Sequence, residues 1–153
     1  MSPADSCEIR PATPADLDAL AGLEDLSFAN PWSRESLAGE LENPSSIFLL
    51  LETIPTRQPV AYACARIIPP EAELLRIAVT PRLRRQHLGF LLLEHLVTLL
   101  RRQKIESLHL EVSENNLPAR KLYSRLDFTR TGRRPGYYDQ GRTAALLLSR
   151  KIL

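Results

Sequence analysis

The chain has 153 residues, of which 44% are hydrophobic and 25% charged, a composition typical of one globular domain with a single core. We therefore expect residues 1–153 to form one domain. The sequence holds no apolar run near the roughly 20 residues that a membrane span needs, and its first residues do not read as a secretory signal. Cys7 and Cys64 are the only cysteines, so no disulfide framework is indicated and a reducing cytoplasm is the expected location.

The net charge of +2 hides an uneven distribution. Residues 1–80 carry 5 Arg/Lys against 12 Asp/Glu, whereas residues 81–153 carry 15 Arg/Lys against 6 Asp/Glu. An acidic half suits a cationic partner and a basic half suits a polyanionic one. Charges scattered over solvated faces would give the same counts, and composition does not decide between the two interpretations.

Two helices are predicted after a short strand at residues 7–10. Thr13 offers an N-cap with proline at the first helical position, and leucines at 17, 20, 23 and 26 form a helical stripe. Asn30-Pro31 ends this helix, and Ser33 can cap a second helix that ends near residue 43.

Strands and the longest helix are predicted for the middle of the chain. Residues 46–52 and 60–68 predict a hairpin, because a proline-containing turn separates two apolar runs. Residues 74–79 predict another strand with alternating apolar side chains. Residues 89–103 predict the strongest helix, whose leucines fall on one face.

The last third predicts strands around a short helix. Residues 107–112 alternate so that Glu111 lies on the face opposite the leucines. A helix at 117–126 and strands at 128–131 and 144–151 complete the order. Because a long helix joins two strands in the middle, we expect a right-handed parallel crossover there and antiparallel pairing in the flanking hairpins. The sequence therefore predicts a mixed α/β fold with helices on both faces of one sheet.

Several segments form a recognisable pattern in a fixed order: Phe-Ala-Asn-Pro-Trp-Ser at 28–33, Ile-Ala-Val at 77–79 before Arg-Arg-Gln-His-Leu-Gly at 84–89, Leu-Glu-Val at 110–112 before two asparagines, Leu-Tyr at 122–123, and a late Tyr-Tyr. In this order the chain resembles the GNAT acyltransferase superfamily, and within it the RimI-type ribosomal-protein-alanine N-acetyltransferases. The resemblance implies a mostly antiparallel sheet of six to seven strands with a splayed central pair. It also implies an acetyl-CoA-dependent N-acetyltransferase that needs no metal.

The resemblance places the cofactor pyrophosphate on the loop before the long helix, where the family has Gln/Arg-x-x-Gly-x-Gly/Ala. Here His87 stands at a family glycine. Histidine can adopt the left-handed conformation at a cost of about 1 kcal/mol, so the loop either keeps its shape with His87 outward or is distorted and binds more weakly. We expect the first. The implied cofactor-binding residues are Ile77, Ala78 and Val79 through their backbone, the loop residues Arg84, Arg85, Gln86, His87, Leu88, Gly89 and Phe90, and Asn116, which could instead be a simple N-cap.

Glu111 and Tyr123 are the candidate catalytic residues by resemblance. A protein α-amine has a pKa of roughly 8, so a carboxylate acting through a water can deprotonate it. The family's glutamate base matches Glu111, and its general acid for the departing thiolate matches Tyr123. Without the resemblance, a glutamate at a strand end is usually solvated and a helical tyrosine can simply be core.

Trp32, Tyr137 and Tyr138 would line the channel for the acceptor peptide, although Trp32 is equally well explained as a core anchor. We expect the partner to be a protein N-terminus, that of a small-subunit ribosomal protein with N-terminal alanine, with no direct nucleic-acid contact, no membrane, and a monomer or weak homodimer. Two alternatives stay open. One is an acetyltransferase for a small amine or a lysine side chain, whose pKa of roughly 10.4 asks more of the base. The other is a non-catalytic acyl-CoA-binding module, for which His87 is the only support.

Overall fold

The computed structural model describes residues 6–153, and its helices and strands follow one another in the predicted order. They are β1 (Cys7–Pro11), α1 (Leu17–Ser27), α2 (Arg34–Glu42), β2 (Ser46–Thr53), β3 (Pro59–Ile68), β4 (Glu71–Val79), α3 (Leu88–Arg102), β5 (Ser107–Ser113), α4 (Leu117–Arg125), β6 (Thr129–Tyr138) and β7 (Thr143–Lys151). Within residues 6–153, no helix is both long and apolar enough to cross a bilayer.

The sheet confirms the predicted fold class. Its seven strands lie in the order β1-β2-β3-β4-β5-β7-β6. Among the described strands, only β4 and β5 pair in parallel, and helix α3 connects them along the chain. All other neighbouring strands pair antiparallel. The strand predicted at 128–131 was too short, because β6 continues to Tyr138. This strand is exposed and polar along most of its length, so it lacks the apolar alternation by which a strand is recognised in a sequence.

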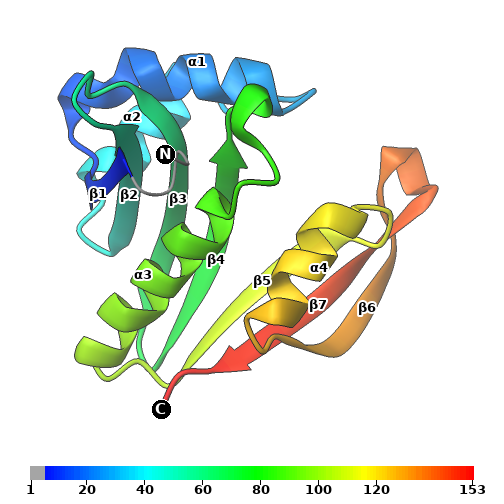
Figure 1. The fold of residues 1–153 in the computed structure, drawn as a ribbon. Coiled ribbons are helices and arrows are strands. Elements are labelled where there is room, and N and C mark those ends of the chain that lie inside the picture. Colours follow the sequence, from blue (N-terminus) through cyan, green and yellow to red (C-terminus); the bar gives the residue numbers. More distant parts are fainter. Residues whose placement is uncertain (1–5) are drawn as a thin grey trace.

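The centre of the sheet is split. Strands β4 and β5 pair only between residues 71–73 and 107–109, and then diverge. Figure 1 shows the result as a V, with β1 to β4 in one arm and β5, β7 and β6 in the other. On the β3 side of β4, Arg76 pairs with Cys64 and Leu74 with Ala65, so Leu75 is a bulge that bends the strand at this point.

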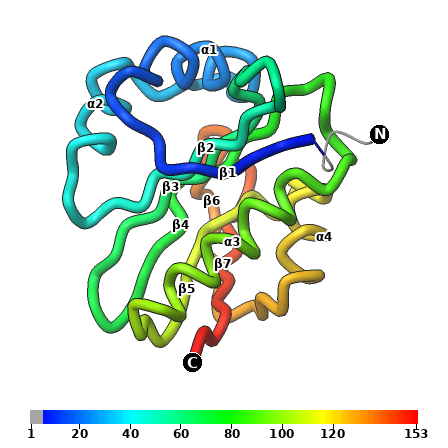
Figure 2. Tube along the Cα trace, turned by 60° about the vertical axis from the view of Figure 1, so that its left-hand side comes forward, coloured from blue at the N-terminus to red at the C-terminus, as the bar shows by residue number. Residues whose placement is uncertain are grey.

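Helices cover the two faces of the sheet unequally (Figures 1 and 2). Helices α3 and α4 share a core with one face, into which α3 buries Leu92, Leu96 and Leu100 as predicted. Helices α1 and α2 form a second core with β2, β3 and β4 on the other face. The face of the β5, β7 and β6 arm that carries Glu111 keeps half-buried and exposed charged side chains.

The ends of the first two helices show which local signals held. Ser33 caps α2, accepting the Ser36 N–H at 3.1 Å, as predicted. Thr13 precedes a short 3-10 turn over residues 14–16 rather than α1 itself, which begins at Leu17. The predicted leucine stripe of α1 was partly wrong, since Leu26 is 63% exposed. The inner face holds Leu20 and Leu23 as predicted, but it continues through Glu24 and Ser27 rather than Leu26, and this places Glu24 against the sheet.

Candidate active site

The gap between the two arms has an unpaired backbone edge. Beyond Glu73, strand β4 pairs with β3 on one side, and within the described residues no strand pairs with its other side. Residues 77–79, which the resemblance implies as backbone contacts of the cofactor, lie on this edge. Free N–H and C=O groups on a strand edge are ready to bond an extended amide-containing chain.

The loop before α3 has the backbone shape of an anion site. Arg85 and His87 both have φ of 64°, in the left-handed region, and α3 begins at the next residue, Leu88. Left-handed residues next to a helix start turn successive N–H groups toward one side, where they can hold a phosphate. The His87 side chain is exposed, so the loop has the shape expected with His87 outward. The contribution of this loop to cofactor binding stays a prediction.

Gly89 brings three elements of the site together. A Cβ built on Gly89 would lie 3.2 Å from the Leu122 side chain of α4, and 3.9 Å from side chains of Ile77 and Val79 on β4. A side chain at this position would crowd the Leu122 side chain, which would have to shift, and a large one would press α4 away from the start of α3. Arg84 completes the connection by donating from Nε to the Val79 carbonyl at 3.2 Å.

Two residues proposed for cofactor binding have structural contacts of their own. Asn116 is the N-cap of α4, since its side-chain oxygen accepts the Ala119 N–H at 3.2 Å. Phe90 holds α3 to α4, with the guanidinium carbon of Arg125 lying 5.1 Å from its ring centroid. These contacts account for both side chains, and their cofactor contacts stay predictions.

Glu111 lies on the arm formed by β5, β7 and β6. Its side chain is 24% exposed, and its Oε1 is 3.0 Å from Nη2 of Arg134 on β6. This ion pair reaches across the intervening strand β7. The Arg134 guanidinium also lies 5.1 Å from the ring centroid of Tyr137. Arg134 therefore orients the candidate base and ties it to the tyrosine pair.

Tyr123 is buried on α4, with its ring centroid 5.5 Å from that of Phe128. Burial, with a smaller contribution from nearby Tyr138, raises the pKa of Tyr123 above the ordinary value of a phenol. Within residues 6–153 its hydroxyl has no hydrogen-bond partner, and the oxygen is not fully enclosed. A phenol that stays protonated is suited to donate a proton, and this role of Tyr123 stays a prediction.

Tyr138 connects the two candidate catalytic residues. Burial raises the pKa of Tyr138, and the Glu111 carboxylate and Tyr137 raise it further, while Arg134 opposes the shift. Tyr138 also interacts electrostatically with Tyr123. The Tyr137 and Tyr138 rings meet edge to face, with centroids 4.9 Å apart. Tyr138 is therefore the group through which the electrostatic environments of Glu111 and Tyr123 are related.

Trp32 lies on the other arm, in the loop between α1 and α2. Its half-buried ring packs against the second core, and the Arg76 guanidinium carbon is 5.1 Å from the ring centroid. The Trp32 N–H donates to Glu24 at 3.4 Å. Of the two interpretations of Trp32, the core anchor describes these contacts, and a contact with substrate stays a prediction.

A buried ion pair that the sequence did not reveal fixes this loop. Glu24 of α1 is 0% exposed and accepts the Tyr62 hydroxyl at 2.5 Å and Nη2 of Arg76 at 2.9 Å. Arg76 projects from β4 beside the bulge, stacks 3.7 Å from the Phe28 ring centroid and donates to the Asn30 carbonyl at 3.1 Å. The loop is therefore anchored to the same strand that borders the gap.

Comparison with known proteins agrees with this architecture. The sequence profile of the acetyltransferase (GNAT) family matches residues 17–128, most of the chain. The chain belongs to the GNAT acetyltransferase family. GNAT membership confirms the predicted fold and the class of enzyme, an acyltransferase.

Two relatives of this GNAT protein cover nearly its whole length. The [ribosomal protein bS18]-alanine N-acetyltransferase of Escherichia coli K12 is 34% identical over 139 residues, 90% of this chain and 92% of the relative. A protein of Bacillus subtilis described as a putative enzyme of the same name is 32% identical over 134 residues, 87% of each chain.

Solved structures have the same fold. The E. coli ribosomal-protein-S18-alanine N-acetyltransferase superimposes with a TM-score of 0.88 at 32% identity, covering 95% of this chain and 94% of the other. Arabidopsis thaliana NAA60 in complex with acetyl-CoA superimposes with a TM-score of 0.87 at 17% identity, covering 96% and 99%, a likeness of fold.

The predicted site residues of this GNAT protein differ in how directly the structure connects them. Gly89 packs beside Ile77 and Val79, and Arg84 bonds the Val79 carbonyl, whereas Glu111 and Tyr123 are related only through Tyr138; the roles of all these residues stay predictions. Sequence reasoning missed Glu24, Arg76 and Arg134. The available signals were an acid on the inner face of an amphipathic helix and an arginine within an apolar strand, both of which require a buried partner.

Proposed function

We propose that this chain is an acetyl-CoA-dependent N-acetyltransferase that acetylates the N-terminal α-amine of a protein, with the N-terminal alanine of ribosomal protein bS18 as the first candidate substrate. The chain would act as one domain spanning residues 1–153. The observation that carries the proposal is the splayed β4–β5 pair, since β5 carries Glu111 just beyond the residues at which the two strands stop pairing. The bS18-alanine acetyltransferase relatives, which match nearly the whole chain, support the choice of substrate.

The residues around the gap fit acetyl-CoA. On the edge of β4 at residues 77–79 the Val79 carbonyl already accepts from Arg84, and the remaining unpaired groups match the amides of a pantetheine arm. The left-handed loop at the start of α3 matches a pyrophosphate. Because Gly89 has no side chain, α3 can pack closely against α4 and β4 at this point. Acetyl-CoA bound there would supply an activated thioester carbonyl.

Glu111 would act as the general base. Because a protein α-amine has a pKa of roughly 8, a carboxylate acting directly or through one water can accept its proton near neutral pH. Arg134 contacts Oε1 of Glu111 and leaves the second oxygen available. The arginine would also hold the carboxylate in one orientation, which lowers the entropic cost of reaching the reactive geometry.

Tyr123 would act as the general acid on the other side of the reacting carbon. Its raised pKa keeps the phenol protonated at neutral pH, so that a proton is always available for the departing thiolate. Backbone N–H groups on the free edge of β4 would polarise the carbonyl and stabilise the charge that develops on its oxygen. These two contributions need no metal.

The acceptor peptide would enter at the open end of the V. Tyr137 and Tyr138 would border its channel on one arm, and the loop that contains Trp32 would border it on the other. The Glu24–Arg76 pair keeps that loop fixed on β4. A cytoplasmic location and a monomer or weak homodimer stay predictions.

Thiol release from acetyl-CoA tests the proposal directly. We expect turnover with a peptide that carries the bS18 N-terminus and loss of that turnover when the same peptide is Nα-acetylated, even if it contains lysines. Turnover that persists on the blocked peptide would make the protein a lysine acetyltransferase. Turnover with small amines alone would make it a small-molecule enzyme, and saturable acetyl-CoA binding without any turnover would favour the binding module.

A further inference from the structure

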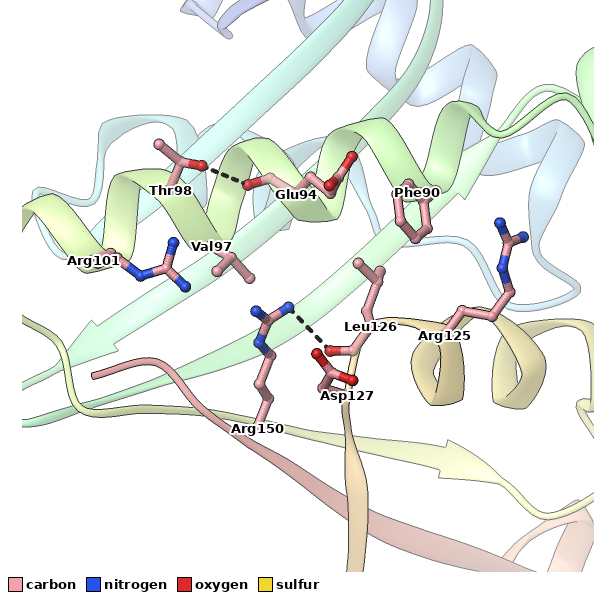
Figure 3. Close-up of a pocket in the computed structure, with 9 residues that line it drawn as sticks. All are labelled: Phe90, Glu94, Val97, Thr98, Arg101, Arg125, Leu126, Asp127 and Arg150. Carbon is pink, nitrogen blue, oxygen red and sulfur yellow. Dashed lines mark hydrogen bonds between the residues drawn. The ribbon is translucent and has the colours of Figure 1, made fainter.

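A cavity runs along α3 from Phe90 to Arg101, beside the end of α4 (Figure 3). It has a volume of about 250 Å³. Its lining is mostly charged, and three arginines contribute: Arg101 from the last turn of α3, Arg125 from the end of α4, and Arg150 from β7. Nothing in the proposed acetyl transfer uses the Arg101 end of this cavity.

Arg101 and Arg150 turn their guanidinium groups toward each other across the cavity (Figure 3). Each is held by a neutral acceptor: Nε of Arg101 donates to the Ile152 carbonyl at 3.3 Å, and Nη1 of Arg150 donates to the Leu126 carbonyl at 3.0 Å. Among the ion pairs of residues 6–153, none includes either arginine. Two like charges are therefore fixed close together without a bonded carboxylate.

Arg150 has an additional unsatisfied donor. Its Nε is fully enclosed and has no hydrogen-bond partner. An enclosed charged donor without an acceptor is unfavourable, and such a group needs an explanation when it occurs in a folded protein. A ligand oxygen entering from the cavity would bond Nη2 of Arg150, which is not among the enclosed donors, and would add a charge-assisted hydrogen bond to this under-satisfied guanidinium.

Two carboxylates also line the cavity and must be weighed. In Figure 3 the Glu94 carboxylate is turned toward Phe90, at the end away from Arg101. Asp127 lies near Arg150 but forms no ion pair within the described residues. Three guanidinium groups against two carboxylates leave the cavity cationic, and the excess is at the Arg101–Arg150 end.

We propose that Arg101 and Arg150 form a binding site for a phosphate group, either free or carried as a phosphomonoester, separate from the proposed pyrophosphate loop before α3. A phosphate can bridge two guanidinium groups and accept from both at once. The site lies about 20 Å along α3 from Leu88, since thirteen residues rise 1.5 Å each. A bound phosphate would connect α3, the end of α4 and the end of β7, and would stabilise the folded protein through its binding energy.

Titration of inorganic phosphate and of AMP into the enzyme saturated with acetyl-CoA tests the site, because the cofactor loop is then filled. We expect saturable binding by calorimetry or by NMR shifts at Arg101 and Arg150, with a similar Kd in the free and saturated enzyme. Tighter binding of AMP would identify a phosphomonoester as the source, and equal binding would identify free phosphate; either supports the site.

Arg101→Gln should weaken binding about tenfold or more, since it removes charge-assisted hydrogen bonds. Arg102→Gln, an exposed neighbour on the same helix, is the matched control and should leave Kd unchanged. Arg150→Gln should weaken binding as much as Arg101→Gln, and unchanged melting temperatures would show that both variants fold. The proposal fails if binding is not saturable, if acetyl-CoA abolishes it, or if Arg102→Gln weakens it equally.

Discussion

Replacing Arg76 by alanine is expected to destabilise the protein by about 3–5 kcal/mol, because the change leaves a buried carboxylate without its cation. Glu24 is 0% exposed, while the Arg76 side chain is 19% exposed and bonds it through Nε at 3.0 Å and Nη2 at 2.9 Å. After the substitution, Glu24 retains the Tyr62 hydroxyl and the Trp32 N–H, which are neutral donors and cannot balance its charge.

The same substitution removes contacts that position the loop between α1 and α2. Arg76 stacks on Phe28 and donates to the Asn30 carbonyl, and both contacts vanish with the side chain. For a protein of this size a loss of 1 kcal/mol lowers the melting temperature by roughly 2–4 °C, so a fall of roughly 6–20 °C is expected. If the loop borders the acceptor channel as we propose, KM for the peptide should rise while KM for acetyl-CoA changes little.

Urea and thermal unfolding of the variant, followed by circular dichroism, measure the effect. Arg34→Ala is the matched control, since Arg34 pairs with Asp18 on the surface, with side chains 58% and 88% exposed. Such exposed pairs contribute about 0–1 kcal/mol. Adding Glu24→Gln to Arg76→Ala removes the buried charge and should restore part of the loss. If Arg76→Ala costs no more than Arg34→Ala, the buried pair does not hold the loop and our reasoning is wrong.

The remaining predictions concern the gap and are measured by steady-state kinetics and calorimetry. Glu111→Gln should lower kcat by about 10²–10⁴-fold with acetyl-CoA affinity retained, since a general base contributes in this range; a kcat near wild type would remove Glu111 from the mechanism. Tyr123→Phe should slow the chemical step and leave acetyl-CoA affinity unchanged. Burial raises the pKa of Tyr123 above the ordinary phenol value of 10.0, so the phenol should stay protonated, and kcat should not fall through loss of this proton, at any pH below 10. A fall in wild-type kcat centred below pH 9 that is absent from Tyr123→Phe would contradict this role. His87→Gly relieves a left-handed residue and should tighten acetyl-CoA binding or leave it unchanged; a large loss would mean that the imidazole itself binds. Gly89→Val places a side chain in the 3.2 Å contact with Leu122 of α4 and should raise KM for acetyl-CoA about tenfold or more. An unaltered KM in a folded variant would show that this contact does not support cofactor binding.

Local signals were sufficient to predict the order of the elements. The Ser33 cap, the leucine face of α3 and the alternation of β5 each depend on residues a few positions apart, so short-range periodicity and capping chemistry reveal them. The resemblance to an acyltransferase family pointed to Glu111 and Tyr123, and the two are linked through Tyr138 in the folded chain. The sequence by itself therefore determined the fold class and the type of chemistry.

Only the tertiary structure decided which charges meet. Glu24 and Arg76 are 52 residues apart, and a buried ion pair leaves no periodic trace in a sequence. Arg134 reaches Glu111 because β7 lies between β5 and β6, an order that chain sequence alone does not specify. The split between β4 and β5 likewise arises from pairing that stops after residue 73. Each of these features depends on non-local pairing, whose energy is gained only when distant segments have already been brought together.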